Sequence, residues 1–146
     1  MPRAKDFFTK EQQDRIVAAV KEAEMNTSGE IRVFIEDKCI ENVLDRAAFI
    51  FEQLEIHKTK ERNGVLFYLA VSHRKFAILG DAGINSKVKP DFWDEIKHTM
   101  VSHFKLQDFA TGMSKGILMA GKALQEYFPH QADDVNELPD EIVFGK

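Results

Sequence analysis

Cysteine, long apolar runs and excess basic charge are all scarce in this chain of 146 residues. The one cysteine, Cys39, cannot form an internal disulfide, so nothing in the sequence favours an oxidising compartment. The amino-terminal residues lead to no apolar segment of signal-peptide length, and no other segment is long and apolar enough to cross a bilayer. We therefore expect a cytoplasmic protein without a membrane segment.

Several functional classes lack their usual signals. The net charge is −4, and basic residues are interleaved with acidic ones, which argues against nucleic acid as the main partner. The chain has no P-loop, no G-x-G-x-x-G and no G-x-S-x-G. The five histidines form no metal signature, since His98 and His103 lie five apart on a predicted helix and point in different directions. We interpret the histidines and Cys39 as residues without a special role.

The most informative stretch present is an apolar hairpin in the middle of the chain. Asn63-Gly64 opens an apolar run from Val65 to Val71, too short for a confident helix and rich in β-branched and aromatic residues. A few polar residues separate it from a second run, Phe76 to Leu79, which predicts a β-hairpin. The second run ends in Gly80-Asp-Ala-Gly83, where we expect a tight turn at the rim of a sheet.

Helical and strand periodicities alternate around this hairpin. The alternation from Glu30 to Glu36 predicts a first strand, and Ile142 to Phe144 could add a short edge strand. Helices are predicted at 10–24, after Asn42, after Pro90-Asp91 and from Asp108 to Phe128. Glycines 112, 116 and 121 weaken the last helix by about 1 kcal/mol each relative to alanine, and we expect close packing on the sheet to compensate.

This order of elements predicts one α/β domain over residues 1–146. A strand–helix–strand crossover gives a parallel pair, and the hairpin adds an antiparallel strand, so the sheet should be mixed, with helices on both faces. Residues 129–146 form an acidic carboxy-terminal tail that packs on the domain or extends from it. Its run Asp133 to Glu137 does not fit a calcium-loop pattern, but part of it could donate an oxygen to a site made elsewhere.

Carboxylates follow the predicted strands and are candidates for a metal site. Ligands of open α/β sheets bind at the carboxyl ends of the parallel strands, where Glu36, Asp37 and Ser72 should lie. Asp81 follows the antiparallel strand, so simple topology puts it at the opposite rim unless its loop folds back. Clustered carboxylates repel one another, and a hard cation such as calcium or magnesium would relieve that repulsion. An ordinary hydrated rim is the alternative.

Three blocks, in this order and spacing, make the chain resemble the TPM domain family. They are Thr27-Ser-Gly-Glu-Ile-Arg-Val33, Arg62-Asn-Gly-Val-Leu66 and Arg74-Lys-Phe-Ala-Ile-Leu-Gly-Asp-Ala-Gly-Ile84. The closing Asn136-Glu-Leu-Pro-Asp-Glu-Ile142 is similar to the short, soluble, cytoplasmic bacterial branch. The resemblance implies a Rossmann-like α/β/α sandwich with a mixed sheet of about four strands.

The resemblance also implies two activities, neither uniform in the family. Some members are acid phosphatases, and some bind calcium or another divalent cation at an acidic rim. Many relatives have an acid where this chain has Arg62, which puts cation binding through that position in doubt.

Three functional hypotheses follow. The first is a module that binds calcium or magnesium through Asp37 and Asp81, with Glu36 and Glu30 as supporting oxygens. The second is a metal-assisted phosphatase of phosphate monoesters, in which Arg74 steadies the phosphate. The third is an adaptor that binds an unidentified protein through the acidic tail.

Overall fold

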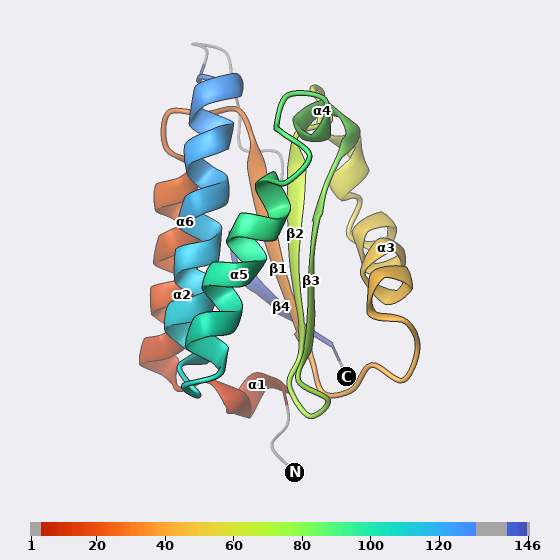
Figure 1. The fold of residues 1–146 in the computed structure, drawn as a ribbon, viewed down its shortest axis with the longest axis vertical. Coiled ribbons are helices and arrows are strands. Elements are labelled where there is room, and N and C mark those ends of the chain that lie inside the picture. Colours follow the sequence, from red (N-terminus) through yellow and green to blue (C-terminus); the bar gives the residue numbers. More distant parts are fainter. Residues whose placement is uncertain (1–3, 131–139, 146) are drawn as a thin grey trace.

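A four-stranded mixed sheet forms the centre of the molecule, with helices on both faces (Figure 1). The structure is a computed structural model that describes residues 4–130 and 140–145. The helices are α1 (Ala4–Phe7), α2 (Lys10–Glu24), α3 (Val43–Gln53), α4 (Ala82–Asn85), α5 (Phe92–Phe104) and α6 (Phe109–Tyr127), with a short 3-10 helix η1 at Ile56–Lys58. The strands are β1 (Glu30–Glu36), β2 (Gly64–Ala70), β3 (Lys75–Gly80) and β4 (Ile142–Phe144).

The strand order is β3-β2-β1-β4. β1 runs parallel to β2 and to β4, whereas β3 returns antiparallel to β2. The register aligns Glu30 with Gly64 at one end of the parallel pair and Glu36 with Ala70 at the other. The predicted hairpin, mixed sheet and short carboxy-terminal strand are therefore confirmed, and the fold is an α/β sandwich.

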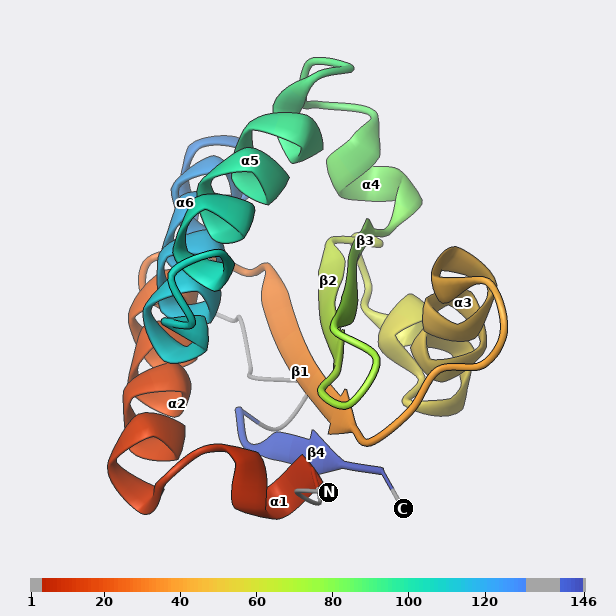
Figure 2. The same cartoon turned by 60° about the horizontal axis from the view of Figure 1, so that its bottom comes forward.

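Two apolar clusters lie on opposite faces of the sheet. Helices α2, α5 and α6 cover one face, and α3 covers the other (Figure 2). Alternation along β1 explains this division, because Ile31, Val33 and Ile35 belong to the larger cluster while Phe34 belongs to the smaller one. Every residue of β1 and β2 is buried, as expected for central strands covered on both faces.

Local capping signals fix where the main helices begin. Thr9 and Gln12 form the predicted capping box at α2, in which each side chain accepts from the other residue's backbone N–H. Asn42 caps α3, and Asp108 caps α6. None of the helices within the described part of the chain is long and apolar enough to span a bilayer.

The glycines of α6 pack mainly against neighbouring helices, whereas we had expected them to pack against the sheet. A Cβ at Gly121 would meet Ala23 of α2, and one at Gly112 would meet Phe104 of α5. A Cβ at Gly116 would meet Met100 of α5 before it met Phe67 of the sheet. The glycines therefore allow close approach of the neighbouring helices more than of the sheet, which corrects the expectation.

Candidate functional site

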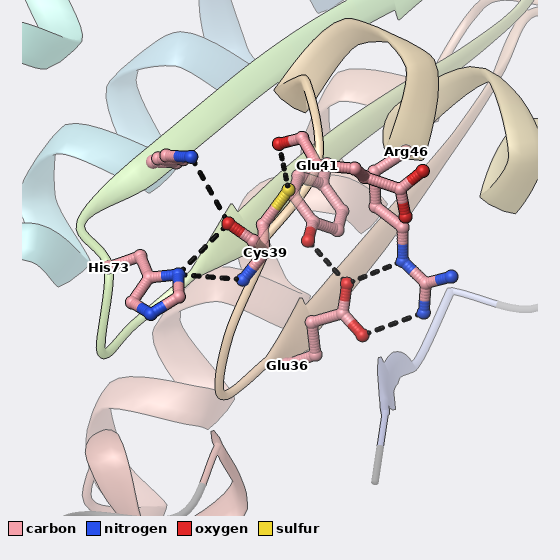
Figure 3. Close-up of polar contacts among 7 residues, drawn as sticks. Glu36, Cys39, Glu41, Arg46 and His73 are labelled. Atoms are coloured by element: carbon pink, nitrogen blue, oxygen red, sulfur yellow. Dashed lines mark hydrogen bonds and ion pairs between the residues drawn. The ribbon is translucent and has the colours of Figure 1, made fainter.

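Glu36, predicted as a supporting metal ligand, is already neutralised by a basic partner. Arg46 Nε lies 2.8 Å from Glu36 Oε2, and Arg46 Nη2 lies 2.9 Å from Oε1 (Figure 3). The Tyr68 hydroxyl also donates a hydrogen bond to Oε2. Burial and this bond raise the pKa of Tyr68, so the hydroxyl remains a donor. Because both carboxylate oxygens are used, Glu36 acts as a structural anchor between β1 and α3.

Asp37 lies beside Ser72 where the two parallel strands end. The Ser72 backbone N–H donates to the Asp37 carbonyl at 2.7 Å. Asp37 Oδ1 and Ser72 Oγ are buried and have no hydrogen-bond partner among the described residues. Asp37 is thus the one predicted ligand at this end with a side-chain oxygen still to be satisfied.

The loop after β1 is held to the hairpin by contacts that sequence spacing did not reveal. His73 Nδ1 lies 3.1 Å from the Cys39 backbone nitrogen and 2.9 Å from its carbonyl oxygen (Figure 3). Lys75 Nζ donates to the same carbonyl at 3.1 Å. The Cys39 thiol points instead to the Glu41 carbonyl, at 3.3 Å. His73 therefore fastens a loop, although we had interpreted it as a residue without a role.

Asp81 is committed to Arg62 and to the start of α4. Arg62 Nε and Nη2 each lie 2.7 Å from an oxygen of Asp81, and the Ala82 N–H donates to Asp81 Oδ1 at 2.7 Å. Asp81 is thereby the N-cap of α4, so a short helix follows β3 where we had expected only a turn. The contact with Arg62 occupies both carboxylate oxygens.

The sheet register separates the predicted ligands into two groups. Glu36 and Asp37 lie at the carboxyl end of β1, whereas Glu30 lies at its amino end. The Asp81 N–H donates to the Gly64 carbonyl, at the same end as Glu30. The six steps from Glu30 to Glu36, at about 3.3 Å each, put these ends about 20 Å apart, so the four carboxylates do not form one site.

Arg74, the predicted phosphate ligand, lies in the hairpin turn that follows β2. Its Nη1 donates to Gln107 Oε1 at 2.8 Å, and its guanidinium carbon lies 5.4 Å from the centre of the Phe109 ring. This turn is at the carboxyl end of β2, away from Glu30 and Asp81.

A second group of acids gathers at the amino-terminal end of β1 (Glu30–Glu36). Glu24, in the last turn of α2, accepts the Ile31 N–H at 2.7 Å through Oε2. Glu24 also forms a side-chain hydrogen bond with Asp140, which precedes β4. Burial, then the bond to Asp140, and then the charges of Asp140 and Glu30 raise the pKa of Glu24 to about 9. At neutral pH, Glu24 is therefore protonated.

Arg32 is the basic residue of this group. It is 7% exposed, and its Nε has no hydrogen-bond partner among the described residues. Burial lowers the pKa of Arg32, while four acids act in the opposite direction: Glu24, Glu30, Asp140 and Glu141. The charges of four acids thus act on one guanidinium, and protonation of Glu24 relieves part of the repulsion among those acids.

Sequence reasoning identified Glu30 in this group but missed Glu24 and Asp140. Glu24 has the pattern of an ordinary acid in the last turn of a helix, and only the fold brings Asp140 to it. The one sequence feature that pointed toward Asp140 was the acidic tail, part of which we expected could donate an oxygen to a site made elsewhere. The run from Asp133 to Glu137 itself lies outside the described residues. Across residues 4–130 and 140–145, no group of three or more His, Cys, Asp or Glu side chains could by itself hold a metal ion.

Comparisons with known proteins agree with this fold. The BA42 protein from the psychrophilic bacterium Bizionia argentinensis is 45% identical over 97% of both chains, with a TM-score of 0.89. The N-terminal domain of a protein from P. gingivalis is 19% identical, with a TM-score of 0.72 over 86% of this chain and 83% of that one. The N-terminal domain of a Corynebacterium glutamicum protein is 11% identical, with a TM-score of 0.64 over 89% and 81%.

At those lower identities, the last two likenesses concern the fold alone. No curated protein matched the chain. The model of the TPM domain family, however, matches residues 3–123. This match covers most of the sequence, and the chain belongs to the TPM domain family.

Proposed function

We propose that this TPM-domain protein binds a divalent cation, calcium or magnesium, at the amino-terminal end of β1. Glu24 and Asp140 are the ligands, and Glu30 adds negative charge. One observation carries the proposal: the partly buried Glu24 carboxyl group is hydrogen-bonded to the Asp140 side chain, and burial, followed by that bond, raises the pKa of Glu24 to about 9. A cation that displaces this proton would neutralise the pair in its place.

The chemistry of the donors fits a hard cation. Calcium and magnesium prefer oxygen ligands, and carboxylates are their usual protein donors. The pair supplies fewer oxygens than either ion takes, so backbone carbonyls and water complete the shell. Arg32 opposes a cation, which makes moderate affinity the expectation rather than tight binding.

An NMR titration of the full chain with calcium chloride and with magnesium chloride tests the proposal. Glu24→Gln keeps an amide oxygen for the Ile31 N–H but removes the charge that would bind the ion. Glu22→Gln is the matched control, because it removes an exposed acid of the same helix. We expect amide shifts at Ile31 in the wild type and in Glu22→Gln at millimolar cation, and their loss in Glu24→Gln. Shifts that persist in Glu24→Gln, or none in the wild type, would reject the site.

The same titration examines the ligands predicted from sequence. Asp37 stays a candidate because Oδ1 is unsatisfied among the described residues. Binding there would shift the Asp37 and Ser72 amides and leave Ile31 unchanged.

The phosphatase alternative gains no further support. Arg74 lies at the far end of the sheet from Glu24, so it could steady a phosphate only beside a cation at the Asp37 end. Phosphatase activity, a cytoplasmic location and a protein partner for the acidic tail all stay predictions from the sequence.

A further inference from the structure

Helices α5 and α6 pack closely at one end and separate toward the other. Where the last turns of α5 lie against the first half of α6, a Cβ at Gly112 or Gly116 would meet Phe104 or Met100, so these glycines permit close contact. Toward the start of α5 and the end of α6 the two helices diverge, as the upper part of Figure 1 shows. A cleft with a volume of about 420 Å³ lies between these diverging ends, and we call it the α5–α6 cleft.

The α5–α6 cleft is apolar at its base and charged around its opening. Its most deeply buried lining residues are Ile96 and Ala123, which are 1% and 6% exposed, and Phe92 and Met119 are partly buried beside them. The charged residues that line it are all exposed: Lys89, Asp91, Glu95, Lys122 and Glu126. None of these five forms an ion pair with another residue in the described part of the chain. A cleft of this volume with an apolar base suits the apolar part of a small molecule.

A second hollow continues the cleft along α6. It has a volume of about 380 Å³ and lies where α2, α5 and α6 meet, so we call it the α2–α6 hollow. The cleft and the hollow share Met119 and Lys122 in their linings. Lys115, which also lines the hollow, is seven positions from Lys122 and therefore on the same side of the helix. Neither lysine is in an ion pair with a described residue, so two ammonium groups without partners border the hollow.

We propose that the cleft and the hollow together bind a free fatty acid of medium chain length. The carboxylate lies between Lys115 and Lys122, and the alkyl chain extends into the α5–α6 cleft. The distribution of apolar residues sets this direction, because they make up more than half of the lining of the cleft and less than half of the lining of the hollow. Along α6, the distance from Lys115 to Tyr127 is about 18 Å at 1.5 Å per residue, which accommodates the head group and the chain.

The acidic residues favour the same direction. Asp91, Glu95 and Glu126 line the cleft, whereas Glu22 is the one acid among the described residues that line the hollow. A carboxylate is therefore repelled from the opening of the cleft and attracted to the two lysines of the hollow. A cationic amphiphile would have to bind in the opposite direction, with its chain in the less apolar hollow, which makes an anionic one the better fit.

NMR titrations of the full chain with hexanoate, octanoate and decanoate, in the absence of divalent cations, test the proposal. The methyl resonances of Met119 and Ile96 should shift, because both residues line the cleft. Each pair of added methylene groups should tighten binding roughly tenfold, as expected when those groups leave water. The Ile31 amide, which reports on the proposed cation site, should not move, so the two sites are distinguished in one experiment.

Two variants test the head-group site. The double variant Lys115→Gln, Lys122→Gln should weaken octanoate binding roughly tenfold, since it removes two exposed ion pairs of modest strength. Lys105→Gln is the matched control, because Lys105 is an exposed lysine that lines neither the cleft nor the hollow. Octan-1-ol has the same chain without the charge, and it should bind the wild type and the double variant equally.

Four results would each overturn the proposal. The first is the absence of shifts at Met119 and Ile96, and the second is an affinity that does not depend on chain length. The third is a double variant that binds octanoate as tightly as Lys105→Gln does. The fourth is tighter binding of octylammonium than of octanoate, which would mean that the acids of the cleft select a cation.

Discussion

At the scale of single residues, identical carboxyl groups have different roles because their neighbours differ. Glu36 and Asp81 each face an arginine and use both oxygens in the ion pair. Glu24 faces Asp140 instead, and burial raises its pKa to about 9. A carboxylate with a basic partner stabilises the fold, whereas one with an acidic partner favours binding a proton or a cation.

The pKa of Glu24 predicts how stability depends on pH when divalent cations are removed. An unfolded glutamate loses its proton near pH 4.5, and folded Glu24 loses it near pH 9. Between these values unfolding releases a proton, so the free energy of unfolding should fall as pH rises, by up to about 1.4 kcal/mol per pH unit. Urea denaturation at a series of pH values measures this slope. Glu24→Gln should flatten it, and an unchanged slope would contradict the assignment.

Breaking the Glu36–Arg46 ion pair should also lower stability, because it leaves a buried charge without its partner. The Glu36 side chain is 5% exposed, so Arg46→Met leaves a buried charge whose remaining donor among the described residues is the Tyr68 hydroxyl. We expect a loss of about 2 to 3 kcal/mol in urea denaturation, moderated because the Arg46 side chain is 27% exposed. The double variant with Glu36→Gln should recover part of it, since no unpaired charge remains. A double variant less stable than Arg46→Met would argue against this explanation.

At the scale of elements, α6 depends on the absence of side chains at its contacts. A Cβ at Gly121 would lie 2.5 Å from Ala23 Cβ and 2.7 Å from Ala23 Cα, which belongs to a backbone that cannot move aside easily. A Cβ at Gly116 would meet Met100 Sδ at 2.5 Å, and that flexible side chain can adjust.

These contacts predict that the same glycine-to-alanine substitution lowers the stability of the protein more at position 121 than at position 116. Gly121→Ala should destabilise the protein by about 1 to 3 kcal/mol, because overpacking against α2 outweighs the gain in helix propensity. Gly116→Ala should change stability less, since propensity offsets the smaller strain. Thermal unfolding of both variants provides the comparison. Equal effects would mean that Ala23 and Met100 accommodate a methyl group equally well.

At the scale of the whole molecule, local signals sufficed for the fold but not for the site. Capping residues such as Thr9, Asn42 and Asp108 and the hairpin runs predicted the elements, because each signal acts over a few residues. Parallel pairing then followed from the order of elements. The loop did not fold back to group Asp81 with Asp37: as simple topology indicated, β3 reverses direction and carries Asp81 to the other end of the sheet.

The acidic group at Glu24 could not be predicted for a related reason. Its members come from the end of α2, the start of β1 and the segment before β4, and only the pairing of β4 with β1 brings Asp140 beside Glu24. Arg62 shows the same dependence on tertiary structure, since its bond to Asp81 joins residues 19 positions apart. Distances of this kind are set by topology, and sequence spacing does not encode them.

Proton release on cation binding tests the central claim most directly. Isothermal titration calorimetry with calcium at pH 7, in buffers of different ionisation enthalpy, counts the protons released per bound ion. Because Glu24 is protonated at pH 7 in the free protein, the wild type should release about one proton, and Glu22→Gln should do the same. Binding without proton release, or release that persists in Glu24→Gln, would contradict the claim that a cation replaces the proton shared by Glu24 and Asp140.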